Sequence, residues 1–407
     1  MKRMDLPKLK LDQAGALEKL VQTLDTLPDP RTQRKPLHAL TTVVAMALCA
    51  VVADCDSWLD IANFAVERKA WFATFLDLTH GVPSRDTFRR VFARLKPQAF
   101  QRLILQFVAA LREPEPSDDQ HLALDGKTLR GSFDRAAEQS PLHLVQAFCT
   151  STHLVLAQAP TTIGAGGEHK QGNEITAIPQ VLDLLDLQGA IITSDAIGCQ
   201  TKIAEIIIAG GGDYLLALKD NHPTLHAQAQ DYFEELHGQE QLPAGVHACE
   251  TADRPAHSRR EQRYYTAAPL PAGLYKHHEW RGLKSLLQTT TVIEHRDGRT
   301  TTDTRYYLSS LPAADINRLA RCVRRHWAIE SAHWVLDVTF GEDASRIRKG
   351  QAAENFATLR RISYALLRTY QKKPRPDQKK TQPSLKGLRK QAGWSTTLLA
   401  KVITQRT

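Results

Sequence analysis

The order of seven apolar segments between residues 121 and 218 most constrains what this chain can fold into. Short apolar runs are typical of buried strands, and apolar residues three or four positions apart are typical of helices. The segments are, in order, strand-like at 121–124, 143–149 and 154–159, helical at 173–187, strand-like at 190–193, helical at 202–209 and strand-like at 214–218. This order, a meander followed by crossover units, predicts an α/β fold with one mixed sheet and helices on its faces.

The segments on either side of this region differ from it in pattern. Residues 1–113 carry apolar residues at helical spacing, and Ser84 supplies a helix-start signal before a helix with an arginine-rich face. Residues 222–310 contain alternating segments rich in Thr, Tyr and Arg, which favour strands, and helical spacing returns after Pro312 and continues to about residue 338. We therefore expect four parts, namely an N-terminal helical, DNA-binding domain at 1–113, a catalytic domain at 119–221 and 311–370, a β-rich insertion at 222–310, and a basic C-terminal tail at 371–407.

The charge of the chain is concentrated at its C-terminal end. The net charge of +9 comes from 53 Lys and Arg residues against 44 Asp and Glu residues. Residues 371–407 hold ten basic residues and one acidic residue, so the first 370 residues are formally neutral. A basic segment of this kind binds polyanions such as DNA without sequence preference. The alternative is a disordered, soluble tail.

The sequence shows no pattern of export or membrane insertion. Its six cysteines lie far apart without a C-x-x-C pair, which is typical of reduced thiols in a cytosol. The longest uncharged apolar run, 39–53, has 15 residues and is too short to span a bilayer, and no signal peptide follows Met1. The GKT at 126–128 lacks the earlier glycine of a P-loop, because residue 121 is His. We expect a soluble cytoplasmic protein without a membrane partner or a nucleotide cofactor.

Two aspartates follow buried strand-like runs directly. Asp125 comes after the apolar residues 122–124, and Asp195 comes after residues 191–194. Ligands of α/β folds bind beyond the carboxyl ends of the strands, so both side chains are candidates for an active site. For either aspartate alone, a turn or a helix cap is an equally good interpretation.

Glu330 lies in a helical segment whose apolar residues predict a buried face. The stripe runs through Val323, Trp327, Trp334 and Val338. Continuing its 3.6-residue period puts Glu330 on or beside the core-facing side. A carboxylate in that position is costly unless it is paired or binds a metal ion.

Two arrangements account for a carboxylate at position 330. It can pair with Arg324 or Arg325, or it can join Asp125 and Asp195 in one site. Polar residues at 326, 330, 333 and 337 also form a strip beside the apolar stripe. Two Asp and one Glu on different elements suit Mg²⁺, which takes a few carboxylates together with water and phosphate oxygens. Two such ions align the attacking and leaving oxygens of an in-line phosphoryl displacement.

At these residues the chain resembles bacterial insertion-sequence transposases of the DDE type, in the group that includes the H-repeat-associated proteins. The similarity covers nearly the whole chain, in many stretches that follow one another in the same order. These stretches are 29–31 (DPR), 47–58 (ALCAVVADCDSW), 82–95 (VPSRDTFRRVFARL), 124–131 (LDGKTLRG), 172–179 (GNEITAIP), 192–200 (ITSDAIGCQ), 214–221 (YLLALKDN), 305–312 (RYYLSSLP), 326–343 (HWAIESAHWVLDVTFGED), 352–361 (AAENFATLRR) and 385–394 (LKGLRKQAGW).

The resemblance implies a ribonuclease-H-like catalytic domain with Asp125, Asp195 and Glu330 as its catalytic, metal-binding triad. It implies two Mg²⁺ ions, for which Mn²⁺ can substitute, and a homo-oligomer acting on DNA, both the element ends and the target. The implied reaction is hydrolysis at the element ends followed by transesterification, in which the freed 3′-hydroxyl attacks target DNA. A protein of this kind is expected on the bacterial nucleoid when bound to DNA.

Basic and polar residues flank the triad in sequence and are candidates to bind DNA phosphates. For each of them, a solvated surface charge is the alternative interpretation. The candidates are Lys127, Arg130, Lys170, Asn173, Arg346 and Arg348.

The sequence departs from a signature that many related transposases carry around the glutamate, Tyr-x2-Arg-x3-Glu-x6-Lys. Val323, His326 and Asp337 stand where the signature has Tyr, Arg and Lys, so only Glu330 fits. His326 and its arginine neighbours can substitute in contacting phosphate, but Asp337 cannot. The resemblance therefore does not extend to the hairpin-forming step inferred from that signature.

Three functions fit these features. The first is an active DNA transposase. The second is a metal-dependent DNA nuclease of the same fold without strand transfer, and the third is a non-catalytic, domesticated DNA-binding protein. The intact set of three carboxylates argues against the third.

Overall fold

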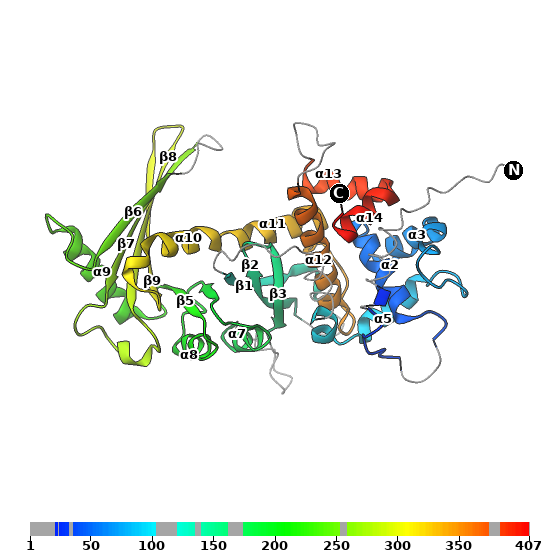
Figure 1. The fold of residues 1–407 in the computed structure, drawn as a ribbon, viewed down its shortest axis with the longest axis horizontal. Coiled ribbons are helices and arrows are strands. Elements are labelled where there is room, and N and C mark those ends of the chain that lie inside the picture. Colours follow the sequence, from blue (N-terminus) through cyan, green and yellow to red (C-terminus); the bar gives the residue numbers. More distant parts are fainter. Residues whose placement is uncertain are drawn as a thin grey trace.

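The computed structural model describes residues 21–22, 24–31, 36–102, 120–134, 140–161, 174–252, 259–373 and 383–406. The molecule is elongated, with a bundle of helices at one end, a sheet in the middle and an extended arm of strands at the other end (Figure 1). Residues near both ends of the described chain, such as Leu24 and Ile403, share one hydrophobic core at the helical end.

In the described part of the chain, one nine-stranded sheet runs through the molecule in the order β3-β2-β1-β4-β5-β9-β8-β7-β6. Strands β1, β4 and β5 are parallel to one another, and all other neighbours are antiparallel. The strands are β1 (His121–Leu129), β2 (Leu142–Cys149), β3 (Leu154–Pro160), β4 (Ile191–Ser194), β5 (Asp213–Leu218), β6 (His247–Ala252), β7 (Arg259–Pro269), β8 (Ser285–His295) and β9 (Thr300–Ser309).

Helices cover both faces of the central strands. Alternate residues of a strand point to opposite faces. Leu122 therefore packs with Ile178 of α7 (Glu174–Leu182) and Ile203 of α8 (Thr201–Ala209). On the opposite face, Ala123 belongs to the core that includes Ile329 of α11 (Ala328–Phe340). The predicted strand and helix order and the ribonuclease-H-like α/β fold are confirmed.

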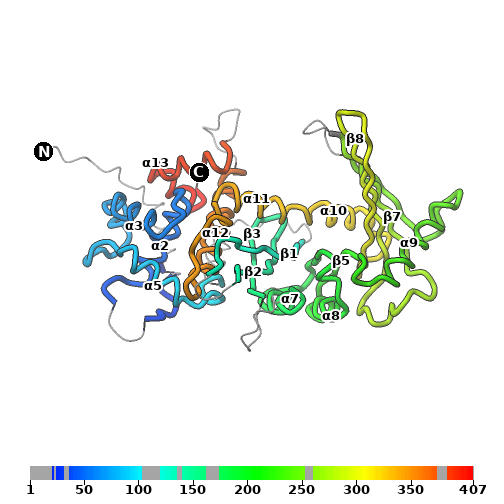
Figure 2. The backbone as a smooth tube through the Cα atoms, turned by 180° about the vertical axis from the view of Figure 1, so that it is seen from behind, coloured from blue at the N-terminus to red at the C-terminus, as the bar shows by residue number. Residues whose placement is uncertain are grey.

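The segment 222–310 extends the same sheet rather than building a separate one. It begins with a helix that the alternating pattern did not predict, α9 (Pro223–His237), and continues through β6 to β9. Strand β9 pairs with β5 along residues 215–218 and 306–309, which joins the segment to the central strands. The long strands β7, β8 and β9 pair along nearly their whole lengths and project as an arm beyond the central strands, as Figure 2 shows from behind.

The helix predicted from Pro312 to about residue 338 is two helices, α10 (Ile316–His326) and α11. The two helices, separated by a break at Trp327, contribute to different cores, α10 to the one with Ile191 and Leu215 and α11 to the one shared with α12. The predicted core stripe is therefore wrong beyond the break, because Trp327, Trp334 and Val338 are exposed. The buried residues of α11 are instead Ile329, Ala332, Leu336 and Phe340.

The helical end combines segments from both ends of the sequence. Helix α2 (Leu40–Val52) is buried along its whole length, because helices from both ends of the chain pack around it. Ser84 caps the next predicted helix as expected, since its hydroxyl accepts the Thr87 N–H at 3.3 Å. The other helices of this end are α3 (Trp58–Glu67), α4 (Lys69–Phe72), α5 (Arg85–Arg94), α12 (Ala352–Lys372), α13 (Leu385–Trp394) and α14 (Thr396–Thr404), and short 3₁₀ turns elsewhere are η1 (Arg130–Ser132), η3 (His277–Glu279) and η4 (Ala313–Asp315).

None of the helices in the described ranges is long and apolar enough to cross a membrane.

Candidate active site

Asp125 and Asp195 lie next to each other at the point where the β1–β4 ladder ends. The last paired residues of these parallel strands are Leu124 and Ser194, and each aspartate is the next residue along its strand. The sequence pattern placed Asp125 just after a strand. In the structure it lies within β1, because β1 continues beside β2 to Leu129. The shorter strand β4 ends first, and this opens a gap beside Asp125.

The turn after β4 holds the Asp195 carboxylate in place. Its Oδ1 accepts the backbone N–H groups of Ile197 at 3.1 Å and Gly198 at 3.4 Å. A Cβ at position 198 would lie 1.9 Å from the Ser194 hydroxyl oxygen, so this tight turn requires glycine. Asp195 is thus a turn residue as well as a candidate ligand, and the two interpretations are compatible.

Glu330 enters the same region from the first turn of α11. The polar strip predicted along this segment lies against the sheet. His333 Nδ1 is 3.4 Å from Asp125 Oδ2, and Lys127 Nζ is 2.7 Å from Asp337 Oδ2. The strip therefore runs alongside β1, with Glu330 near its middle.

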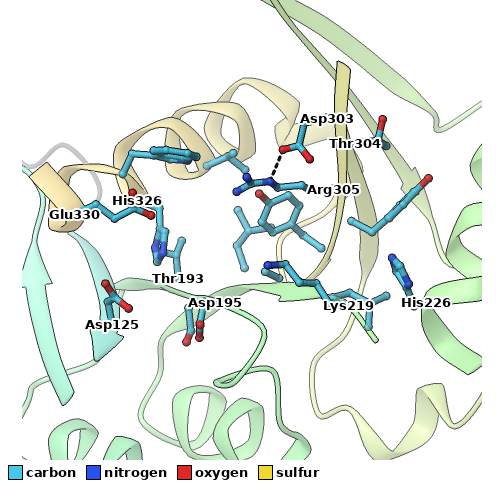
Figure 3. Close-up of a pocket in the computed structure, with 18 of the residues that line it drawn as sticks. Asp125, Thr193, Asp195, Lys219, His226, Asp303, Thr304, Arg305, His326 and Glu330 are labelled. Carbon is cyan, nitrogen blue, oxygen red and sulfur yellow. Dashed lines mark hydrogen bonds and ion pairs between the residues drawn. The ribbon is translucent and has the colours of Figure 1, made fainter. Parts of the chain in front are cut away.

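Together these elements form a cavity of about 490 Å³ whose walls include all three carboxylates, Asp125, Asp195 and Glu330. Figure 3 shows their side chains at one end of it, with Lys219 and Arg305 toward the other end. The cavity is large enough for a nucleotide-sized group of the kind that small-molecule and cofactor sites hold.

The charge of Asp125 disfavours the charged forms of the other two carboxylates. Burial raises the pKa of Asp195, and the nearby charges of Asp125 and Glu174 raise it further, while backbone hydrogen bonds oppose the shift. Burial also raises the pKa of Glu330, again with a contribution from Asp125, against the attraction of Arg305 and His333. Crowded oxygen ligands of this kind are stabilised by a divalent cation, so the donor set fits a hard metal ion.

The side chains do not converge into a finished coordination sphere. Within the described ranges, no three His, Cys, Asp or Glu side chains are close enough together to hold one ion. An ion here would rely on one or two carboxylates with water and phosphate oxygens as its other ligands, which is common for Mg²⁺.

Of the residues predicted to bind phosphate, the four that the structure describes do not line this cavity. Lys127 is buried and paired with Asp337, and Arg130 is exposed with its Nε 3.4 Å from Asp343 Oδ2. Arg348 Nε is 3.2 Å from Asp134 Oδ2. Arg346 packs over the Phe133 ring at 5.2 Å, while Lys170 and Asn173 lie outside the described residues. The four described residues therefore lie along the far half of β1 and the segment after α11.

Two cationic residues of the cavity were not predicted. Lys219 directly follows β5, which is parallel to β1 and β4, so its position after a strand is a signal that could have identified it. Arg305 comes from the antiparallel strand β9, pairs with Asp303 at 2.7 Å and stacks on the Trp327 ring at 5.4 Å. No local pattern brings Arg305 to the site, because only the β5–β9 pairing places it there.

Comparison with known proteins gives consistent results over most of the chain. The family described as "Transposase DDE domain" matches residues 116–366, and one described as "DDE_Tnp_1-associated" matches residues 21–108. The chain is 34% identical over 397 residues to "Putative transposase YncI" of Escherichia coli O157:H7, covering 95% of each chain. It is 35% identical over 359 residues to "H repeat-associated putative transposase YhhI" of Escherichia coli strain K12, covering 86% of this chain and 90% of the relative.

Among solved structures, a piggyBac transposase synaptic complex with hairpin DNA aligns with 97% of this chain and 79% of its own, at 9% identity and a TM-score of 0.36.

Proposed function

Because this chain belongs to the DDE transposase family of bacterial insertion sequences, we propose that it cuts DNA at the ends of its element and joins those ends to target DNA. The observation that carries the proposal is the meeting of Asp125, Asp195 and Glu330 in one cavity, although they are 70 and 135 residues apart in sequence.

The three carboxylates would hold Mg²⁺, or Mn²⁺ in its place, as two ions. The metal supplies positive charge that neutralises the reacting phosphate and aligns the attacking and leaving oxygens. Proteins of this family generally use a divalent metal, and the raised pKa of Asp195 and Glu330, to which burial and the charge of Asp125 contribute, supports such a site here.

One carboxylate set can serve both steps of the reaction. Water attacks the phosphodiester at the element end, the bond to the 3′-oxygen breaks, and a 3′-hydroxyl is released. That hydroxyl then attacks a phosphodiester of the target, forming one bond as another breaks. The nucleophile changes while the in-line geometry stays the same, so no additional catalytic group is needed.

Exposed arginines outside the cavity support the proposal that DNA binds along the surface of the molecule. Arg130 and Arg346 are exposed beyond Asp125, and the helix α5 carries Arg85, Arg89 and Arg90. We propose that these residues contact phosphates, that the protein acts as a homo-oligomer on DNA, and that it is found on the nucleoid when bound.

The direct test is cleavage and joining of DNA that carries the ends of the genomic element encoding this chain. We expect Mg²⁺-dependent release of 3′-hydroxyl ends and their joining to a second DNA. Asp125→Asn, Asp195→Asn and Glu330→Gln keep the side-chain shapes but remove charge. Each should reduce the rate by more than about 100-fold, since changes behind a metal ligand already cost about 10- to 100-fold.

The matched control is Asp231→Asn, which removes an exposed carboxylate on α9 far along the chain from the triad. It should act like the native protein. Cleavage without joining would favour a nuclease, and full activity of Asp195→Asn would exclude the proposed site.

A further inference from the structure

A chain of hydrogen bonds leads from the buried side of β1 to the cavity. His121 Nδ1 is 3.1 Å from the Thr150 hydroxyl oxygen, and His121 Nε2 is 2.9 Å from the Thr193 hydroxyl oxygen. The same Thr193 oxygen is 2.7 Å from His326 Nδ1. Figure 3 shows Thr193 and His326 side by side, between the carboxylates of the cavity.

The inner part of this series of hydrogen bonds is shielded from water. His121 is 1% exposed and Thr193 is 3% exposed. Burial, with smaller contributions from the neighbouring His326 and Arg325, lowers the pKa of His121 to about 3, so this imidazole is neutral at ordinary pH. Burial also lowers the pKa of His326. Each neutral imidazole carries one N–H and one bare nitrogen, and the hydrogen bonds decide which is which.

The single proton of the Thr193 hydroxyl means that the hydrogen bonds between the two histidines all run in one direction at a time. The Thr193 hydroxyl has one proton, so it donates to one imidazole and accepts from the other. At the inner end, the Thr150 hydroxyl is 3.1 Å from His121 Nδ1 but 3.4 Å from the His121 carbonyl oxygen. That carbonyl already accepts the Thr150 backbone N–H at 3.0 Å. Donation from Thr150 to His121 Nδ1 is therefore favoured.

The remaining protons follow from that first bond. His121 then donates its Nε2–H to Thr193, and the Thr193 hydroxyl donates to His326 Nδ1. The N–H of His326 is left on Nε2, at the edge of the ring away from Thr193. His326 lines the cavity, and the charge of Asp125 acts on it, which also favours an N–H on that edge.

We propose that His326 donates its Nε2–H to the reacting phosphate, and that Thr193 and His121 are positioning residues that fix its tautomer and ring orientation. This inference rests on the proposed phosphodiester chemistry. The bond also ties the end of α10 to β4, since Thr193 is two residues before Asp195 and His326 is four residues before Glu330. The same contact therefore helps to seat Glu330 over the two aspartates.

The kinetic test compares variants in single-turnover cleavage of the element-end DNA with Mg²⁺. Thr193→Val keeps the side-chain shape and removes both hydrogen bonds, and should lower the cleavage rate by about 10- to 100-fold, as a lost positioning group does. DNA affinity should change by less than about threefold, because one phosphate contact among many is affected. Thr193→Ser should restore the rate to within about threefold of the native value.

Two further variants separate the donor from the fold. His326→Phe removes the N–H and should cost about 100- to 1,000-fold, the usual cost of one donor to a reacting oxygen. His326→Gln keeps an N–H donor and should retain more activity than His326→Phe. The control Thr358→Val removes a buried hydroxyl that accepts the Gln158 side-chain amide at 2.9 Å in α12, and should leave the rate unchanged.

A spectroscopic test does not depend on catalysis. Long-range ¹⁵N–¹H spectra of the full chain, labelled at histidine, should show Nε2–H tautomers for His121 and His326, identified by the signals lost in His121→Gln and His326→Phe. Adding element-end duplex without metal should shift the His326 Nε2 signal.

An Nδ1–H tautomer at His326, an unshifted signal, or a native rate in Thr193→Val would each overturn the inference. Absent cleavage by the native protein together with the predicted tautomers and shift would instead count against the proposed function alone.

Discussion

At the scale of single residues, the burial of charge separates the candidate site from the rest of the protein. The Asp195 and Glu330 carboxylates face a cavity in which the charge of Asp125 raises the pKa of both, although Arg305 and His333 partly oppose the shift of Glu330. Some buried carboxylates elsewhere are instead paired with a base. Glu342, for example, is fully buried against Arg361. Unpaired acidic groups that face a cavity are typical of functional sites, and paired ones are typical of the core.

Glu354 gives a residue-scale prediction about stability and pH. Burial in α12, only partly opposed by Arg361, raises the pKa of this carboxyl to about 7. Because the folded pKa lies above the unfolded pKa, the native state holds the proton more tightly. Above about pH 7 the charged carboxyl therefore destabilises the folded protein by the full amount. This destabilisation shrinks as the pH falls and disappears below about 4.5.

We expect Glu354→Gln to stabilise the protein at pH 8 by roughly 3 kcal/mol, since each unit by which the pKa is raised above its ordinary value of 4.5 costs about 1.4 kcal/mol. The gain should largely disappear near pH 4, where the carboxyl is protonated in the native state and mostly protonated in the unfolded state. Urea unfolding at the two pH values measures the difference, with the exposed Glu67→Gln as the control. An equal gain at both pH values would contradict this explanation.

At the scale of elements, one buried ion pair joins the end of α11 to α12. Arg361 NH1 is 2.7 Å from Glu342 Oε1, and its NH2 is 3.3 Å from Oε2. Burial alone would raise the pKa of Glu342, but Arg361 and Arg360 outweigh it and hold the pKa below its ordinary value. With its amide suitably oriented, Gln146 of β2 also accepts from Arg361, so the pair connects both helices to the sheet beneath them.

Removing one member of this pair should cost more than removing both. Arg361→Met leaves a buried carboxylate without its partner and should destabilise the protein by about 3–5 kcal/mol. The double variant Glu342→Gln/Arg361→Met removes the uncompensated charge and should recover most of that loss. Chemical denaturation of the native protein and the two variants tests this order. If the double variant is as unstable as the single one, the burial of charge is not the cause.

At the scale of the whole molecule, the last helices are part of the N-terminal bundle. Arg389 of α13 is fully buried, and its guanidinium is 2.9 Å from Asp54 and 2.7 Å from Asp56. It also donates to the carbonyl oxygens of Val51 and Thr339, at 3.1 and 2.7 Å. A basic residue of the segment expected as a DNA-binding tail is thus neutralised inside the protein, and three distant parts of the chain meet around it.

We expect Arg389→Met to loosen the helical end while leaving the sheet intact. Hydrogen exchange should increase in α2, α13 and α14 and stay unchanged in β1, β4 and β5, because the lost bonds join α13 to residues 51–56 and to the end of α11 and none of them reaches a strand. The adjacent exposed Lys390→Met is the matched control and should exchange like the native protein. Faster exchange in the sheet as well would show that the two ends are one cooperative unit.

The sequence by itself determined the features that depend on neighbouring residues. Strand and helix order from 121 to 218, the Ser84 cap and the place of two aspartates after apolar runs all follow from local periodicity and capping. The polar strip at residues 326–337 could also be predicted from the sequence. Its spacing follows one helical period, which the single-residue break at Trp327 does not interrupt.

Tertiary structure decided what depends on partners far away in the chain. The stripe through Trp327, Trp334 and Val338 is exposed because α11 packs a different face, with Ile329, Ala332 and Leu336, into the core. Arg305 reaches the cavity through the β5–β9 pairing, and His121 reaches Thr193 across two strands. These contacts are set by register and packing between distant segments, so no local pattern in the amino-acid sequence encodes them on its own.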